Sequence, residues 1–246
     1  MCFSWIQIMQ GVVPMHIGVI PDGNRRWARR VGLPITEAYR IGSDKVEEFL
    51  NWSLDFGIKI VTVYVLSTEN FLRRSKLELD LLYRLLKEKL IKVRRDERIH
   101  RNRVRVRVIG RTWLLPEDVR REIELTEETT ADYSDHYLNL AVVYGGRQEI
   151  IDAVRKLFAD YNSGKLSISD LNEETLFKYL YVGDEPYPEP DLIIRTGGEY
   201  RISNFLLYET AYSELYILNK YWPEITKEDL KQALDDYARR ERRFGR

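Results

Sequence analysis

HIGVIPDGNRRWA, residues 16–28, joins an apolar run to a polar turn and then to two arginines. The run 16–20 is typical of a buried strand, and a helix is predicted to follow the turn. Gly23 permits a close backbone approach, and helix N-terminal N–H groups beside arginines suit a phosphate. Asp22 adds one carboxylate, which suits Mg²⁺ next to a phosphate. The alternative interpretation is a plain surface turn in which Asp22 caps the helix.

The composition describes a chain that can build a full core and carries no net charge. Its 246 residues fit one large α/β domain or two small ones, and 44% are apolar. Lysine plus arginine equals aspartate plus glutamate, at 39 each, so any anion site must be local. The only cysteine, Cys2, excludes an intrachain disulfide and favours a reducing cytoplasm. Residues 1–15 are predicted to be an N-terminal extension, and no apolar run is long enough to span a bilayer.

Short β-branched runs alternate with longer helical patterns along the chain. The predicted strands are 16–20, 60–66, 104–109, 137–143, 192–195 and 215–218. The predicted helices are 25–31, 37–56, 75–96, 116–130, 147–161, 170–181 and 226–243. This alternation predicts a single α/β domain over residues 16–246, with a mostly parallel central sheet of about six strands and helices on both faces.

Polar clusters follow four of the predicted strands. They are 21–26, 67–70 with Arg73 beyond, 144–147 and 195–204. Ligands of parallel sheets gather beyond the carboxyl ends of the strands, so the four clusters are expected to meet at one edge. Each cluster alone is as well explained by a capped turn.

A basic stretch, 98–111, needs a separate explanation. Arg103, Arg105 and Arg107 alternate with valines, which predicts a strand with an exposed arginine face. RNA binding is the alternative, but interleaved aromatic residues are absent and the net charge is zero. A solvated edge strand with no nucleic-acid partner is therefore the preferred interpretation.

Five blocks of the chain resemble the cis-prenyltransferases, the undecaprenyl diphosphate synthase family. They are HIGVIPDGNRRWA, TVYVLSTENFLRR, LNLAVVYGGRQEI, PDLIIRTGGEYRISNFLLYETAYSELY and RERRFG. The blocks follow the family order from His16 to Gly245, and the surrounding sequence is most similar to the archaeal branch. The combination is specific, because a shared fold alone would not reproduce all five.

The resemblance implies a homodimeric, Mg²⁺-dependent enzyme that adds isopentenyl diphosphate to an allylic diphosphate primer, farnesyl or geranylgeranyl. Its product would be a long cis-polyprenyl diphosphate, the precursor of a glycosyl carrier lipid, held in a hydrophobic tunnel. A cytoplasmic location with peripheral membrane contact through the lipid product is implied. The alternative is a non-catalytic partner subunit of a heteromeric enzyme, which would be expected to have lost Asp22 and parts of the first block.

The resemblance also assigns roles to individual residues. Asp22 is the central catalytic carboxylate and a Mg²⁺ ligand, Glu214 is a second metal ligand, and Asn70 is the position linked to proton removal. An amide is a poor base, so a positioning role for Asn70 is preferred. The implied substrate-binding residues are Gly23, Asn24, Arg25, Arg26, Trp27, Tyr39, Ser67, Thr68, Glu69, Phe71, Arg73, Arg195, Arg201, Ile202, Ser203, Arg243 and Gly245.

The chain departs from the family pattern at two of these positions. Tyr39 stands where the family often has a histidine that touches diphosphate, and Phe71 replaces a tryptophan. A tyrosine donates a hydrogen bond but carries no charge at neutral pH. The allylic site is therefore expected to be weaker, or shaped for a different primer. The tunnel wall is expected to include Val65 or Leu66 and the leucines Leu77, Leu81, Leu82 and Leu85.

Overall fold

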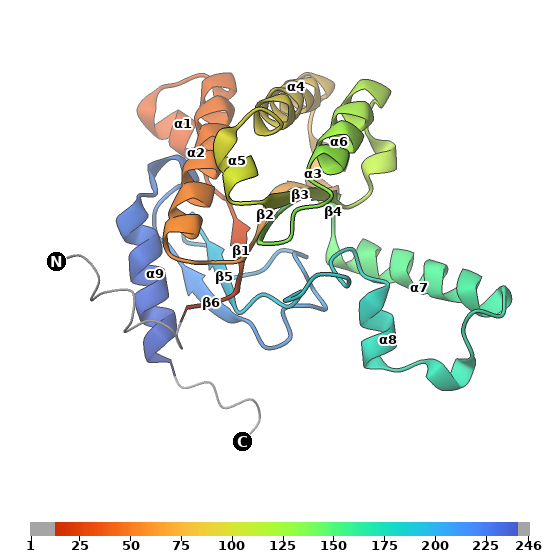
Figure 1. The fold of residues 1–246 in the computed structure, drawn as a ribbon. Helices are drawn as coiled ribbons and strands as arrows, with labels where there is room; N and C mark the ends of the chain where they lie inside the picture. Colours follow the sequence, from red (N-terminus) through yellow and green to blue (C-terminus); the bar gives the residue numbers. More distant parts are fainter. Residues whose placement is uncertain (1–12, 241–246) are drawn as a thin grey trace.

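Six parallel strands form the centre of the computed structural model, which describes residues 13–240 (Figure 1). They are β1 His16–Ile20, β2 Ile60–Ser67, β3 Val104–Ile109, β4 His136–Tyr144, β5 Leu192–Arg195 and β6 Glu214–Ile217. The strand order is β3-β4-β2-β1-β5-β6, and β1 pairs its Ile20 with Arg195 of β5. The prediction of a parallel six-stranded sheet is confirmed, and the carboxyl ends of its strands share one edge.

The helices follow the predicted pattern with three differences. They are α1 Asn24–Val31, α2 Ile35–Asp55, α3 Thr68–Arg73, α4 Lys76–Val93, α5 Glu97–Arg101, α6 Glu117–Thr129, α7 Gly146–Asn162, α8 Glu173–Lys178 and α9 Lys227–Arg239. The predicted helix 75–96 ends at Val93, and a new helix starts after Asp96, which accepts from the Arg98 N–H. Helix α3 was not predicted, although the Ser67 side chain caps it. Helix α8 is shorter than predicted.

Two buried clusters cover the two faces of the sheet. The larger one packs alternate strand residues such as Val19 and Val63 against α2, α4, α6 and α9. The smaller one packs Ile20 and Tyr64 against Phe205 and other side chains. Helices were expected to cover this second face as well. The covering side chains come instead mainly from irregular chain near residues 182 and 205–206.

The arginine strand is an edge strand, as predicted, but Arg107 is less exposed than expected. β3 lies at one end of the strand order. The Arg107 side chain is only 21% exposed and pairs with Asp184 at 2.7 Å and Glu185 at 3.1 Å. Arg103 pairs with Asp135 at 3.6 Å. These charges are already neutralised within the fold, which agrees with a structural role.

The chain before β1 is tied to the sheet from Met15 onward. The Met15 N–H donates to Asp191 Oδ2 at 2.8 Å, and its carbonyl accepts from the Ile60 N–H at 2.9 Å. Residues 1–12 of the predicted extension lie outside the described residues. Within residues 13–240, no helix is both long enough and apolar enough to cross a membrane.

The carboxyl end of β2 contains a register shift beside the cavity described below. Its pairing with β4 slips between Tyr64 and Leu66, so Val65 is left out of the ladder. Such a bulge changes the direction of the neighbouring side chains. Val65 consequently lines the cavity, while both Val65 and Leu66 join the larger core cluster.

Candidate active site

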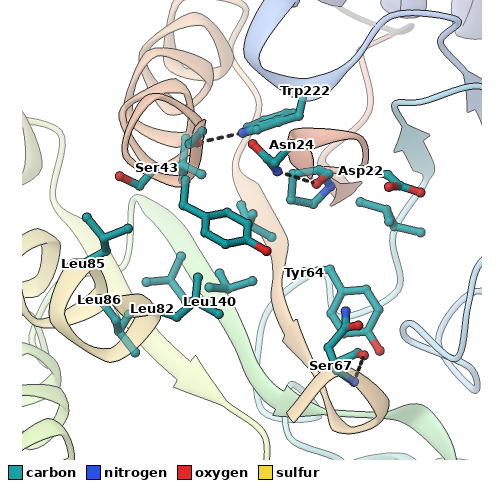
Figure 2. A pocket seen from close by; sticks show the side chains of 18 of the residues that line it. Asp22, Asn24, Ser43, Tyr64, Ser67, Leu82, Leu85, Leu86, Leu140 and Trp222 are labelled. Atoms are coloured by element: carbon teal, nitrogen blue, oxygen red, sulfur yellow. Dashed lines mark hydrogen bonds between the residues drawn. The ribbon is translucent and has the colours of Figure 1, made fainter. Parts of the chain in front are cut away.

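A cavity of about 1070 Å³ begins at the carboxyl edge of the sheet and continues between α2 and α4. Its polar end collects residues from all four predicted clusters. The residues from those clusters that line it are Pro21, Asp22, Gly23, Asn24, Arg25, Arg26, Ser67, Glu69, Asn70, Arg73, Arg147, Arg195, Glu199, Arg201, Ser203 and Asn204. Convergence of the clusters on one edge is therefore confirmed, and Figure 2 shows Asp22 at this polar end, away from the leucines of α4.

Asp22 sits at the centre of the polar end and does not cap α1. The N-cap of α1 is Gly23, and no side chain caps it, so the plain-turn interpretation is wrong. Gly23 has φ +106°, and a Cβ there would lie 2.4 Å from the Tyr221 ring, so the turn requires glycine. This conformation leaves the Asp22 carboxylate free to point toward the cavity.

Two arginines hold the Asp22 carboxylate. Arg195 Nη2 donates to Asp22 Oδ2 at 2.9 Å, and Arg26 Nη2 lies 3.2 Å from Oδ1. Burial by itself would raise the pKa of Asp22, but the hydrogen bond and charge of Arg195, with those of Arg26, outweigh it and lower the pKa. Asp22 is therefore ionised across the physiological range, with an arginine beside each of its oxygens.

Arg195 connects the first and fourth clusters. It is only 4% exposed, and its Nη1 donates to Ser203 Oγ at 2.7 Å. Its Nε is buried without a hydrogen-bond partner. Glu199, which the sequence analysis did not single out, accepts from Arg26 at 2.9 Å and from Arg201 at 2.6 Å. Three arginines thus surround two carboxylates, an excess of positive charge that favours an anionic ligand.

The second cluster is ordered by helix α3. The Ser67 hydroxyl accepts from the Asn70 N–H at 3.0 Å, which places the Asn70 side chain at the cavity. Glu69 accepts from Asn204 Nδ2 at 2.9 Å, joining this cluster to the fourth. Thr68 is buried and bonds the Val143 carbonyl at 3.4 Å, and Phe71 packs against the core, so neither lines the cavity.

Tyr39 and Arg74 form a second cationic position in the cavity. The Arg74 guanidinium lies 5.2 Å from the centroid of the Tyr39 ring, and the Tyr39 hydroxyl donates to Glu78 at 3.4 Å. The Arg74 backbone N–H donates to the Asn70 carbonyl at 2.9 Å, but its side-chain Nε is buried without a hydrogen-bond partner among residues 13–240. Burial lowers the pKa of Arg74. Arg73, which the resemblance singled out, is exposed at the rim.

The remaining wall of the cavity is apolar and comes from α2, α4, β2, β4 and α5. Leu82, Leu85 and Leu86 of α4 lie near Leu140 of β4 (Figure 2). Val65, Leu82 and Leu85 line the cavity, as predicted. The prediction for Leu77 is wrong, since it is 82% exposed and points away. Leu66 and Leu81 do not line the cavity. Leu66 packs into the core instead.

Several other expected site residues lie elsewhere. Trp27 and Ile202 are half-buried but do not line the cavity. Arg243 and Gly245 lie outside the described residues. Glu214 pairs with Arg240 at 2.6 Å at the amino end of β6. It is opposite the first residue of β5, whereas Arg195 and the Asp22 cavity lie at the other end of that strand, about 10 Å away.

The match to known proteins agrees with this geometry. A family model described as a putative undecaprenyl diphosphate synthase matches residues 20–245. The chain belongs to this prenyltransferase family. Similar archaeal relatives include a protein of Methanopyrus kandleri, 53% identical over 98% of this chain and 88% of its own, and one of Thermoplasma volcanium, 49% identical over 95% and 89%. Both are named tritrans,polycis-undecaprenyl-diphosphate synthase (geranylgeranyl-diphosphate specific).

Solved structures of this prenyltransferase family share the fold. Lavandulyl diphosphate synthase from Lavandula x intermedia, in complex with dimethylallyl diphosphate, superposes with a TM-score of 0.90 at 34% identity and covers 96% of this chain and 99% of its own. A probable undecaprenyl diphosphate synthase from Campylobacter jejuni gives 0.75 at 33% identity, with coverage of 95% and 99%. The resemblance to the archaeal branch of the family is confirmed, because both relatives named above come from archaea.

The donor set at the polar end fits a magnesium ion that is held jointly with a substrate. Within residues 13–240, no group of three histidine, cysteine or carboxylate side chains gathers to bind a metal. Asp22, however, presents an ionised carboxylate into the cavity. Mg²⁺ does not need a full protein cage, because it commonly uses one or two carboxylates, waters and substrate phosphates. A diphosphate would supply the missing oxygens.

Proposed function

We propose that this prenyltransferase extends geranylgeranyl diphosphate by repeated condensation with isopentenyl diphosphate and makes a long cis-polyprenyl diphosphate. The observation that carries the proposal is the single continuous cavity, with Asp22 and its arginines at one end and leucine walls beyond. Such a cavity suits a ligand with an anionic head and a growing apolar tail. The choice of primer rests on the printed names of the archaeal relatives. A glycosyl carrier lipid is the proposed use of the product.

In the proposed reaction the allylic C1–O bond breaks and the bond electrons leave with the diphosphate. The isopentenyl double bond attacks C1, a new C–C bond forms, and a proton passes from C2 of the added unit to the released diphosphate. Mg²⁺ when bound supplies positive charge beside the leaving diphosphate. Arg25, Arg26 and Arg74 line the cavity where that diphosphate is proposed to bind. Asn70 is proposed to orient the reactants, since its amide is not a base.

The isopentenyl diphosphate is proposed to bind Arg195, Arg201 and Ser203. Arg195 already donates to the Ser203 hydroxyl, so a phosphate could bind both groups without rearrangement of the backbone. Arg195 also contacts Asp22, which places the two proposed diphosphate positions next to each other. This proximity is what a condensation between two bound diphosphates requires.

A homodimer is proposed because α7 carries an apolar face that nothing in residues 13–240 covers. Ile151, Val154, Phe158 and Tyr161 are between 44% and 60% exposed. Their spacing places them along one side of the helix, which projects from the body of the fold (Figure 1). Glu214 could serve as a metal ligand only for a cavity other than that of its own chain. A cytoplasmic location, with membrane contact through the product, completes the proposal.

Replacement of Asp22 tests the proposed function. Wild-type protein, radiolabelled isopentenyl diphosphate, geranylgeranyl diphosphate and Mg²⁺ should give a ladder of long products after dephosphorylation. Asp22→Asn should abolish that ladder, and EDTA should stop the wild-type reaction until Mg²⁺ is restored. Asp80→Asn, on the exposed side of α4, is the control and should retain turnover. A wild-type protein that binds both diphosphates but transfers nothing would instead favour the non-catalytic partner subunit.

A further inference from the structure

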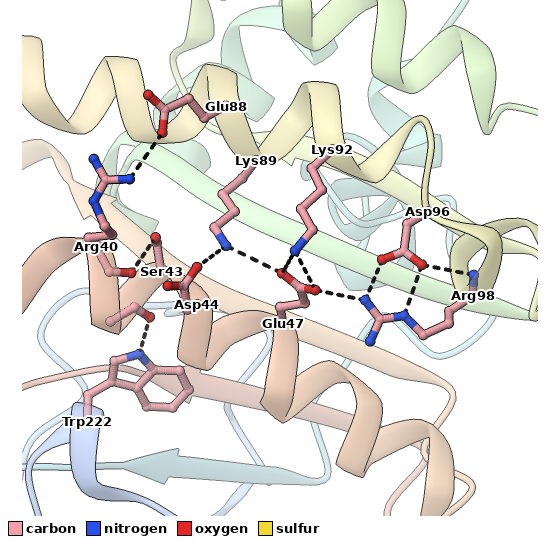
Figure 3. A network of polar contacts seen from close by, with 11 residues as sticks. Arg40, Ser43, Asp44, Glu47, Glu88, Lys89, Lys92, Asp96, Arg98 and Trp222 are labelled. Carbon is pink, nitrogen blue, oxygen red and sulfur yellow. Dashed lines mark hydrogen bonds and ion pairs between the residues drawn. The ribbon is translucent and has the colours of Figure 1, made fainter.

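Part of the wall of the apolar cavity is charged. Its lining includes Glu47 of α2, Lys89 and Lys92 of α4, and Asp96 and Arg98 at the start of α5. These five residues and Asp44 form what we name the Glu47 network (Figure 3). An apolar product that extended between α2 and α4 would meet this network. A charged boundary at that place is unexpected for a tunnel that must hold a hydrocarbon.

Glu47 is the centre of the network and joins three elements. Lys92 Nζ donates to both Glu47 oxygens at 2.9 Å, and Arg98 Nη2 donates at 2.7 Å. Lys89 Nζ lies 3.4 Å from Glu47 and also bonds Asp44. Asp44 and Glu47 of α2 thus face Lys89, Lys92 and Arg98 across the gap, and Asp96 holds Arg98 from its own side, as Figure 3 shows. The network closes this gap with side chains, not with backbone.

The layer of charge is thin. A shallow hollow on the outer surface is lined by Lys92, Asp96 and Arg98, and the same three residues line the main cavity. Each therefore contacts both spaces, so only this layer of side chains separates the cavity from the outside at this point. Loss of the ion pairs would join the two spaces without any change in the helices.

The network is exposed on one side, where the side chains of Asp44, Lys92 and Arg98 are 57%, 57% and 44% exposed, and is partly removed from water at Glu47 and Lys89. The Glu47 side chain is 28% exposed and that of Lys89 is 24% exposed. Burial opposes ionisation of Glu47, but hydrogen bonds from Lys92 and Arg98 outweigh it, and the pKa of Glu47 is lowered. A hydrocarbon end that pushed between these groups would separate the partly buried Glu47 from its cations, which is unfavourable.

We propose that the Glu47 network is a gate that ends the product cavity and sets the maximum length of the polyprenyl chain. Elongation stops when the apolar end of the product reaches the paired charges. Opening the gate lets that end pass between α4 and α5 into the outer hollow, so more units can be added. This inference rests on the proposed elongation activity, and it identifies a determinant of product length that lies outside the leucine wall.

The gate is tested by product length in variants that open it. Glu47→Ala removes the central carboxylate, and Lys92→Ala removes a cation whose side chain is 57% exposed and so tolerates truncation. Both variants should shift the longest and the most abundant products upward by one or more isoprene units. The rate of the first condensation should stay within about twofold of wild type, because the diphosphate contacts are unchanged.

Arg40→Gln is the matched control. Arg40 pairs with Glu88 at 4.0 Å, so it also joins α2 to α4, but it lines neither space (Figure 3). Its product ladder should equal that of wild type. Folded, active Glu47→Ala and Lys92→Ala proteins with unchanged or shorter ladders would overturn the gate, as would the same lengthening in Arg40→Gln. Failure of the proposed function is a different result, because the wild-type protein would then make no ladder at all.

Discussion

Arg74 provides the sharpest test of how this chain compensates for Tyr39. Arg74→Met keeps a long apolar side chain on the Tyr39 ring and removes the charge. A charge-assisted hydrogen bond contributes roughly 1.5–3 kcal/mol, so the KM for the allylic primer should rise by about 10- to 100-fold. The upper part of this range is expected, because the Nε of Arg74 is already buried and binding removes little further water from it.

The stability of the same variant should change little. Its cation–π contact with Tyr39 contributes about 0.5–1 kcal/mol, and the loss is offset because a buried N–H without a partner disappears. Thermal unfolding of Arg74→Met should therefore stay within a few degrees of wild type. A large loss of primer affinity in a protein of normal stability is the signature of a ligand-binding residue.

Initial rates measured against each substrate, with the other saturating, provide the assay. Arg84→Met, which removes an exposed guanidinium from α4, is the control and should leave both KM values unchanged. The reasoning is refuted if Arg74→Met leaves the primer KM unchanged. It is equally refuted if the KM for isopentenyl diphosphate rises as much, because Arg74 would then not distinguish the two diphosphate positions.

Three further predictions concern the cavity and two buried titrating groups. Leu85→Phe should shorten the products, because Leu85 lines the cavity and added bulk there cannot be displaced without strain. Burial raises the pKa of the Glu209 carboxyl well above its ordinary value. The contribution of Glu209 to stability is therefore full below the ordinary carboxyl pKa and is lost as the pH rises toward the raised pKa. Glu209→Gln should unfold at a higher temperature than wild type at about pH 8.5, and the difference should shrink at about pH 5. Burial lowers the pKa of His16 from 6.5 to about 4, so wild type should lose on the order of 3 kcal/mol as the pH falls across that window.

Each of these predictions has a clear measurement and control. Products of Leu85→Phe are sized on the same ladder as wild type, and a Leu77→Phe change on the exposed side of α4 should have no effect. Thermal unfolding across pH measures the Glu209 effect against Glu124→Gln, an exposed carboxyl on α6. Equal stability of Glu209→Gln and wild type at every pH would refute that assignment. For His16, denaturant unfolding at several pH values should show the loss, and His16→Gln should flatten it.

The sequence alone determined the local and periodic features of this chain. Alternating apolar strands and amphipathic helices predicted the parallel sheet, because strand burial and helix faces leave a pattern in consecutive residues. The turn at Asp22 and Gly23 was recognisable for the same reason, since its chemistry is contained in a few adjacent positions. Five blocks in family order then predicted the family. Helix α3 could also have been found, because Ser67 is a typical N-cap residue.

Only the tertiary structure decided which distant residues share the cavity. Asp22 and Arg195 are 173 positions apart and meet because β1 and β5 are neighbours in the sheet. Nothing in the amino-acid sequence favoured Arg74 over Arg73, because the two differ in burial, and burial does not show in adjacent residue types. The face of α2 that lines the cavity, and the pairing of Glu47 with α4, depend on how two helices pack. Packing is set by contacts across the whole chain, and no local window of sequence contains them.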